Sequence, residues 1–372
     1  MSGDSTHCPV CDSGSVSDCV RIPRVPVYCN VLHEDRNAAL NAPMGDIDLR
    51  FCSQCGHLFN AAFDPGRVDY SGGYENSLHF SGRFREYARG LAEHLIELHG
   101  LRGKTVIEIA CGQGDFLGLL CSLGGNRGVG FDPGHVPGRS EASAGTDLTF
   151  IRDYYSEAYA GHAADLICCR HALEHIDRPG DFLKTVRRAI GEHPSAVFFE
   201  VPNALFTLRD LGIWDIIYEH CGYFSEDSLR EVFRRSGFQV DRVETGFGEQ
   251  FLALHASPGG TRIAAHRRPS SDLSGLVNRF AEHYRAKVEG WGETLRRLHR
   301  DGARTVLWGA GSKGVSFVNL LSVTEEIGCL IDLNPYKDGR FVPGTERPHV
   351  GTHAQEYQRA AAHEEGDAQA LV

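Results

Sequence analysis

The chain has 372 residues, of which 41% are hydrophobic and 23% are charged, and its formal net charge is −11. The acidic balance argues against a general nucleic-acid-binding protein, because such proteins need clusters of lysine and arginine. No apolar run approaches the roughly 20 residues that span a bilayer, and the N-terminus has no apolar signal segment, so we expect a cytoplasmic protein with no membrane partner.

Composition and hydrophobic patterns divide the chain into four predicted segments. Residues 1–70 hold cysteines, prolines and short apolar runs, and they predict a small domain with little core of its own. Residues 71–260 alternate strand and helix patterns. Residues 261–350 begin with a linker rich in glycine, proline, serine and arginine and continue into a second α/β pattern. Residues 351–372 form a polar, alanine-rich tail.

Two C-x-x-C pairs occur in the first segment. They supply Cys8 and Cys11 in "HCPVC" and Cys52 and Cys55 in "FCSQCGHLF". Four thiolates are enough to close a tetrahedral zinc site, and a site with four protein ligands is structural because it has no open position. The alternatives are unrelated buried cysteines or one redox-active pair. The sequence therefore predicts a structural Zn²⁺ site.

A helical pattern covers residues 80–100, and strand and helix patterns alternate after it. The predicted strands are "TVIEIA", "GVGFD", "ADLICC", "AVFFEVP" and "FLALHASP", and the predicted helices between them are "GDFLGLLCSL", "PGDFLKTVRRAI" and "SEDSLREVFRRSGF". Strands that alternate with helices indicate a doubly wound, mostly parallel α/β sheet.

A glycine turn follows the first strand of this pattern in "VIEIACGQGDFLGLL". It lacks the third glycine of the dinucleotide pattern G-x-G-x-x-G. It resembles motif I of the class I methyltransferases that use S-adenosylmethionine, whose turn lies against the methionine and ribose portions of the cofactor. The resemblance implies that five residues contact the cofactor: Glu108, Ala110, Gly112, Gln113 and Gly114.

The same resemblance extends to the ends of the next strands. It implies that Asp132 and Pro133, in "GVGFDP", lie at the ribose hydroxyls and that Asp153, in "FIRDYYSE", lies near the adenine amino group. Arg170 and His171, in "LICCRHALEHI", would lie beside the cofactor, because ligands bind at the carboxyl ends of strands in open α/β sheets.

The order of cysteine pairs, methyltransferase pattern and second α/β pattern carries a wider resemblance. Together with "SGGYENS", "LEHI", "FFEVPN", "YEHCGYFS" and "GRFVPGT", it resembles the zinc-containing C-methyltransferases that act on nucleotide-linked deoxysugars in antibiotic pathways. The resemblance covers about residues 7–348. It implies S-adenosylmethionine and Zn²⁺ as cofactors, and a small-molecule acceptor such as a nucleotide-linked sugar.

Methylation of carbon requires a base, because a proton beside a carbonyl group must be removed before carbon attacks the methyl group. Histidine titrates near neutrality and suits this role. The resemblance places the base at His220, with Glu219 orienting it, and implies active-site roles for His175, Tyr74 and Tyr218. Each histidine has the alternative of a purely structural role.

Three further residues are expected to bind the acceptor. The resemblance implies Asn203 in "FFEVPN" and Tyr223 in "YEHCGYFS", while Lys313, near a helix N-terminus, suits a phosphate or carboxylate. The chain departs from the family in two respects. Tyr218 directly precedes Glu219, whereas the family usually has one residue between the tyrosine and the EH pair, and the C-terminal domain is short after "GRFVPGTERPHV". The short domain suggests a different or smaller acceptor.

A second glycine turn, "VLWGAGSKG", satisfies G-x-G-x-x-G and is followed by Asp332 at the distance typical of NAD-binding sites. The unit is too short for a full dinucleotide fold, and no residues for hydride transfer follow it, so we expect acceptor binding or a structural turn. Three functions remain as alternatives: an O- or N-methyltransferase, a non-catalytic zinc- and nucleotide-binding protein, and an NAD-dependent reductase.

Overall fold

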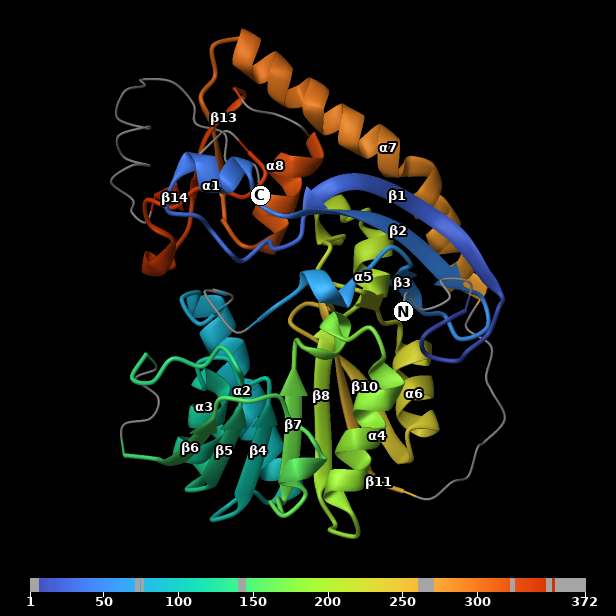
Figure 1. Ribbon diagram of the computed structural model, residues 1–372, viewed down its shortest axis with the longest axis vertical. Coiled ribbons are helices and arrows are strands. Elements are labelled where there is room, and N and C mark those ends of the chain that lie inside the picture. The colour runs from blue at the N-terminus through green and yellow to red at the C-terminus, as the bar shows by residue number, and fades with distance from the viewer. Residues whose placement is uncertain are drawn as a thin grey trace.

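The described residues of the computed structural model form three β-sheets (Figure 1). The structure describes residues 7–70, 74, 77–139, 145–259, 271–321, 325–345 and 350–351. Residues 260–270, which make up the middle of the predicted linker at 257–275, and nearly all of the predicted tail lie outside this range. Within it, we find no helix that is both long enough and apolar enough to cross a bilayer.

The central sheet has the strand order β10-β11-β8-β7-β4-β5-β6. Its strands are β4 (Thr105–Ile109), β5 (Arg127–Phe131), β6 (Asp147–Ile151), β7 (Leu166–Arg170), β8 (Ala196–Pro202), β10 (Phe238–Gly246) and β11 (Phe251–Pro258). The strands β4 to β8 run parallel, whereas β11 is antiparallel to both β8 and β10. The predicted doubly wound α/β sheet is confirmed, and an antiparallel edge makes it mixed.

Helices cover both faces of the central sheet, as the continuous apolar runs of its strands predict. On one face, Val106, Leu166 and Phe198 pack against α2 (Gly82–His99) and α3 (Asp115–Gly124). On the other face, their neighbours Ile107 and Phe199 pack against α4 (Pro179–Ile190) and α6 (Glu226–Arg235). The alternation of side chains along each strand produces this division.

The helix predicted over residues 80–100 is α2. It begins because the Ser81 side chain accepts the N–H of Phe84, and it ends at Gly100, which has a positive φ of 61°. The apolar periodicity of the sequence places Leu95 and Leu98 near one face of this helix. Leu95 is buried, in a stripe with Ala88 and Ala92, whereas Leu98 is 42% exposed.

Two strands of the central sheet, β6 and β10, are missing from the sequence prediction. They are the two edge strands of this sheet and pair on one side only. Polar residues interrupt the apolar ones in both: Asp147 and Thr149 in β6, and five residues in β10. Edge strands lack the continuous apolar runs that revealed the buried strands, which explains why the pattern did not predict them.

The N-terminal segment forms most of a second sheet, which has the strand order β1-β2-β3-β9. Its strands are β1 (Val16–Pro26), β2 (Met44–Cys52), β3 (Leu58–Asn60) and β9 (Gly222–Tyr223), and the short helix α1 (Arg36–Leu40) precedes β2. Because β9 comes from far along the chain, the N-terminal sheet is completed by a later segment. The helices α5 (Ala204–Arg209) and α7 (Ser271–Arg300) pack on it.

The C-terminal segment forms a small parallel sheet with the order β12-β13-β14. Its elements are β12 (Thr305–Trp308), α8 (Ser312–Leu321), β13 (Ile327–Ile331) and β14 (Val350–Gly351). Figure 1 shows this unit above the carboxyl ends of the central parallel strands, beside α1 and one end of α7. The sequence from about residue 276 to 300 has the pattern of a polar helix; this helix is α7, and it begins five residues earlier.

Candidate active site

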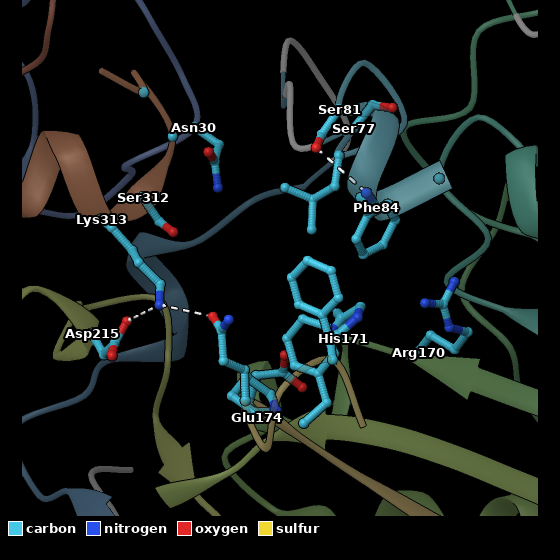
Figure 2. A pocket seen from close by; sticks show the side chains of 18 of the residues that line it. Asn30, Ser77, Ser81, Phe84, Arg170, His171, Glu174, Asp215, Ser312 and Lys313 are labelled. Atoms are coloured by element: carbon cyan, nitrogen blue, oxygen red, sulfur yellow. Dashed lines mark hydrogen bonds and ion pairs between the residues drawn. The ribbon is translucent and has the colours of Figure 1, made fainter. Parts of the chain in front are cut away.

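One cavity of about 610 Å³ lies where the central sheet meets the C-terminal unit. Both glycine turns line it: Ala110, Gly112 and Gln113 belong to the first turn, and Gly309 and Gly311 belong to the second. Figure 2 shows Lys313 of α8 on one wall of the cavity, and His171 and Glu174 on the side of the central sheet. The two glycine turns, which lie almost 200 residues apart in the sequence, therefore line the same cavity.

The first glycine turn has an unusual backbone between β4 and α3. Ala110, Gly112 and Gly114 have positive φ angles of 56°, 55° and 84°. A Cβ atom on Gly114 would lie 2.4 Å from the ring of Phe150, so this position requires glycine for packing as well as for conformation. The turn thereby exposes its backbone to the cavity.

Two carboxylates lie at this turn. Asp132, directly after β5, accepts the N–H of Gly112 at 2.9 Å and that of Gly134 at 2.8 Å, so it holds the turn in place. Asp132 and Pro133 are not among the residues that line the cavity. Glu108 does line it and is buried, and its Oε2 atom has no hydrogen-bond partner in the described part of the chain. Burial raises the pKa of Glu108 to about 8.

The structure does not bring Asp153 to the cavity. Its carboxylate is exposed and accepts the hydroxyl of Tyr159 at 2.6 Å. The residue follows β6 as expected, but the chain continues away from the first turn and ties Asp153 to a neighbouring 3-10 turn. The expected contact with adenine therefore has no support in this geometry.

Arg170 and His171 line the cavity through a buried polar network centred on Glu200 of β8. Arg170 donates to Glu200 at 2.7 Å, and His171 Nε2 lies 2.9 Å from the same carboxylate. Tyr87 also donates to Glu200. Burial raises the pKa of Glu200, but Arg170, His171 and Tyr87 outweigh it and lower the pKa to about 2. The charge of Arg170 is thus already paired.

His175 and His220 meet in the same cavity. Their rings are edge-on, with centroids 4.9 Å apart, and Tyr70 Oη lies 2.8 Å from His175 Nδ1. His175 ends a 3-10 turn after β7 rather than lying on a longer helix. Burial lowers the pKa of His175 to about 4 and that of His220 well below its ordinary value, with His175 adding to the effect on His220. Both imidazoles are therefore neutral near pH 7.

The carboxyl group beside this histidine pair belongs to Glu174, which the sequence analysis did not single out. One ligand atom from each of Glu174, His175 and His220 lies within 4.8 Å of the others. Glu174 is buried, its Oε2 atom has no hydrogen-bond partner among the described residues, and burial raises its pKa to about 8. The motif "LEHI" contains both Glu174 and His175, but the sequence analysis assigned an active-site role only to the histidine.

Glu219 has a different position from the one expected. It accepts the backbone N–H of Cys29 at 2.7 Å and lies beside Tyr74, whose hydroxyl accepts from Asn30 at 3.2 Å. Burial raises the pKa of Glu219 to about 7. Glu219 therefore connects Tyr74 to the N-terminal segment, and no bond from it to His220 is found within the described residues. Tyr74 itself lines the cavity as expected.

Tyr218 lies outside the cavity. Its hydroxyl accepts the N–H of Asp64 at 2.9 Å, and its ring packs against Gly45 and Phe63 in the core of the N-terminal sheet. His220 lines the cavity and Tyr218 does not, so the position of Tyr218 gives no support to its expected catalytic role.

The three residues expected to bind the acceptor all line the cavity. Asn203 caps α5 by accepting the N–H of Leu205, and the hydroxyl of Tyr223 bonds to the backbone of Ile217. Their polar atoms are thus engaged in holding the fold. Lys313 Nζ lies 2.9 Å from Asp215, in the arrangement that Figure 2 shows.

The second glycine turn repeats the construction of the first. Asp332, after β13, accepts the N–H of Ala310 at 2.8 Å, and a Cβ atom on Gly314 would lie 2.0 Å from the carbonyl oxygen of Gly309. The difference is Lys337, a buried lysine whose Nζ lies 3.2 Å from Asp332 and donates to Ala310 O. The acid that would hold a ribose in an NAD site is here paired with a lysine.

The four cysteines of the C-x-x-C pairs converge in the N-terminal segment. Their sulfur atoms lie within 4.8 Å of one another, with Cys8 and Cys55 3.5 Å apart and Cys11 and Cys52 3.6 Å apart. Tetrahedral zinc with Zn–S bonds of about 2.3 Å requires sulfur separations of about 3.8 Å. The four thiols are free and buried, and their spacing fits this requirement.

Two protein-family models match the chain. A methyltransferase domain matches residues 80–243, and a C-methyltransferase C-terminal domain matches residues 265–361. The second match covers the unit that carries the second glycine turn. No protein of curated function matches the chain significantly.

Solved methyltransferases show distant similarity. Magnesium protoporphyrin IX methyltransferase of Synechocystis PCC 6803, with bound S-adenosylhomocysteine, is 16% identical over 48% of this chain and 84% of its own, with a TM-score of 0.37. Burkholderia thailandensis 1,6-didemethyltoxoflavin-N1-methyltransferase, with bound 1,6-didemethyltoxoflavin and S-adenosylhomocysteine, is 17% identical over 47% of this chain and 80% of its own, with a TM-score of 0.38. The domain matches, rather than these distant similarities, decide the assignment: the fold is that of the class I methyltransferases.

Proposed function

We propose that this chain, a methyltransferase dependent on S-adenosylmethionine, methylates a carbon atom beside a carbonyl group of a small molecule. The observation that carries the proposal is the pair formed by His175 and His220, which lies in the cavity that the first glycine turn also lines. The C-methyltransferase C-terminal domain that closes the same cavity supports the choice of carbon over oxygen or nitrogen.

The first glycine turn is the site for the methyl donor. Its exposed backbone, the unpartnered Oε2 atom of Glu108 and the position of Asp132 at the end of β5 fit the amino-acid and ribose portions of S-adenosylmethionine. The donor supplies an electrophilic methyl group. The protein's contribution is to hold that group toward the histidine pair in a productive orientation.

His220 is the base. Because its imidazole is neutral near pH 7, its lone pair can accept the proton from the carbon beside the carbonyl group. The electron pair of the broken C–H bond stays on the acceptor and forms an enolate. The carbon of this enolate then takes the methyl group. Glu174, whose carboxyl group lies beside the histidine pair, can ionise and stabilise the imidazolium that forms. Tyr74, whose pKa burial raises well above its ordinary value, keeps its proton and can donate it in a hydrogen bond to the enolate oxygen.

The acceptor in this proposal is a nucleotide-linked deoxysugar or a related anionic small molecule of secondary metabolism, such as an antibiotic pathway would use. Lys313 and Lys337 both line the cavity on the side of the second glycine turn. A phosphate or carboxylate group on the acceptor would meet Lys313 at the start of α8 and Lys337 in the 3-10 turn Pro335–Lys337 after β13. The pairing of Lys337 with Asp332 disfavours NAD at this turn.

The cysteine cluster is a structural zinc site. Cys8, Cys11, Cys52 and Cys55 would hold Zn²⁺ as thiolates and leave no position open for chemistry. Their sulfurs belong to the same hydrophobic core as Phe59 and Phe224, so the ion would tie the N-terminal segment to the rest of the chain.

The experiment that tests the proposal is product analysis with a nucleotide-linked keto-deoxysugar as acceptor. A methyl group labelled with ¹³C should appear on carbon, and in D₂O without methyl donor the acceptor should exchange the proton beside its carbonyl group. Both signals should disappear in His220→Gln. A label on oxygen or nitrogen would overturn the proposal.

A further inference from the structure

A second group of metal-ligating side chains lies away from the cavity. It consists of His94 on α2 and Glu244 and His255 on the edge hairpin β10–β11, and one ligand atom from each lies within 4.8 Å of the others. None of the three lines the cavity. His255 lies four residues along β11 from Phe251, which does line it.

Strand register explains why these residues meet. Arg242 of β10 pairs with His255 of β11, and Glu244 pairs with Ala253. Residues two apart on a strand point to the same face, so Arg242, Glu244 and His255 share one face of the hairpin. Ala253 belongs to the core that α2 covers, and this places His94 of α2 over the same face.

His255 has an environment that suits a metal ligand. Its side chain is buried, and neither ring nitrogen has a hydrogen-bond partner among the described residues. A buried polar side chain without a partner is costly to the fold unless it serves another purpose.

A positive charge already lies where the ligand atoms converge. The guanidinium of Arg242 lies 3.0 Å from His94 Nε2 and 3.4 Å from Glu244 Oε1. Because a guanidinium can only donate, the lone pair of His94 Nε2 must point toward it. The Arg242 side chain is 35% exposed, so it can move into solvent and leave the three ligand atoms to another cation.

We propose that His94, Glu244 and His255 bind a divalent transition-metal ion, with Zn²⁺ as the natural candidate. Two imidazole nitrogens and one carboxylate suit zinc and its neighbours in the first transition row rather than magnesium or calcium. The ion replaces the Arg242 guanidinium and joins α2 to the outermost hairpin of the central sheet. The site is independent of the proposed function and of the cysteine cluster.

The test is a calorimetric titration of the untagged, full-length protein with Zn²⁺, after its resident zinc has been measured and free metal removed. We expect one further equivalent to bind. His94→Gln and Glu244→Gln, both changes of exposed side chains, should weaken this binding at least tenfold, whereas His283→Gln, an exposed histidine on α7, should leave it unchanged. Wild-type affinity in the first two variants, or no further equivalent in the wild type, would overturn the proposal.

Arg242→Gln provides the sharper test, because it predicts a gain. Removing the competing guanidinium should tighten zinc binding several-fold and increase the rise in Tm that zinc produces. A nonspecific surface site would not respond in this direction. Binding that is no tighter in Arg242→Gln than in the wild type would contradict the placement of the ion among these three ligands.

Discussion

The imidazole rings of His175 and His220 lie edge-on at a centroid distance of 4.9 Å, in the cavity that the first glycine turn also lines. One ring comes from the turn after β7, and the other comes from the segment before β9. The central sheet and the N-terminal sheet thus each contribute one histidine. This relationship supports the proposed base and its partners, and the first two predictions follow from it.

Replacing His220 by glutamine should remove turnover without removing the methyl donor. Loss of a general base typically costs about 100-fold or more in rate. Affinity for S-adenosylhomocysteine, measured by calorimetry, should change less than about threefold, because the first glycine turn is untouched. His283→Gln on α7 serves as the matched control and should keep full activity. Turnover within about twofold of the wild type in His220→Gln would remove this residue from the mechanism.

Glu174→Gln tests the carboxyl group beside the histidine pair. The change keeps the shape of the side chain but removes its ability to become charged beside an imidazolium. We expect kcat to fall by roughly 10- to 100-fold, with KM for the methyl donor nearly constant and an altered pH dependence of kcat. An unchanged pH profile would indicate that Glu174 only fills space.

Glu108→Gln should change how stability depends on pH. Burial raises the pKa of Glu108 to about 8, so the folded chain holds a proton that the unfolded chain loses above about pH 4.5. The folded state is therefore destabilised progressively as pH rises from about 4.5 to about 8. Glutamine cannot ionise, so the Tm of Glu108→Gln should exceed that of the wild type at pH 8 by several degrees and approach it at pH 5. Parallel Tm curves for the two proteins would contradict the raised pKa.

Zinc removal should destabilise the N-terminal segment. We expect Cys52→Ser to lose about one equivalent of zinc, measured by elemental analysis, and to lower Tm by several degrees, because the four sulfurs lie in a buried core. Cys19→Ser, at a partly exposed cysteine outside the cluster, should keep the metal. Zinc content equal to the wild type in Cys52→Ser would show that the cluster is not the site.

Lys313→Gln should weaken binding of the acceptor rather than binding of the methyl donor. Lys313 is exposed at the start of α8 and shares its charge with Asp215, so its loss should raise KM for an anionic acceptor by roughly tenfold. Affinity for S-adenosylhomocysteine should not change. Added salt should reduce the difference between wild type and variant, because screening weakens an exposed charge. A loss of affinity for S-adenosylhomocysteine, with an unchanged KM for the acceptor, would show that Lys313 binds the methyl donor and would contradict this prediction.

Local patterns predicted the buried parts of the fold well. The apolar runs of β4, β7 and β8, and the helical pattern of α2, follow from burial. The edge strands β6 and β10 were missed because one side of each is unpaired and their sequences are polar. Side-chain direction was also hidden from the sequence: Tyr218 and His220 are two residues apart, yet only His220 lines the cavity, and Glu219 contacts Cys29 instead of the histidine.

Contacts between distant segments explain the remaining differences. Lys337 pairs with Asp332 beside the second glycine turn, and no short sequence motif predicts such a pair. Glu174 and His220 meet only because β9 adds to the N-terminal sheet after the chain has passed the central one. The convergence of two glycine turns on one cavity has the same origin, since it depends on how the C-terminal unit lies over the parallel strands.

The most direct test of the account is a pair of calorimetric titrations on cofactor-stripped protein, one with S-adenosylhomocysteine and one with NADH. We predict one site for S-adenosylhomocysteine, weakened at least tenfold in Gly114→Ala because a Cβ atom there meets Phe150, and no site for NADH. Absence of heat with S-adenosylhomocysteine, or a tight site for NADH, would contradict the assignment of the methyl donor to the first glycine turn.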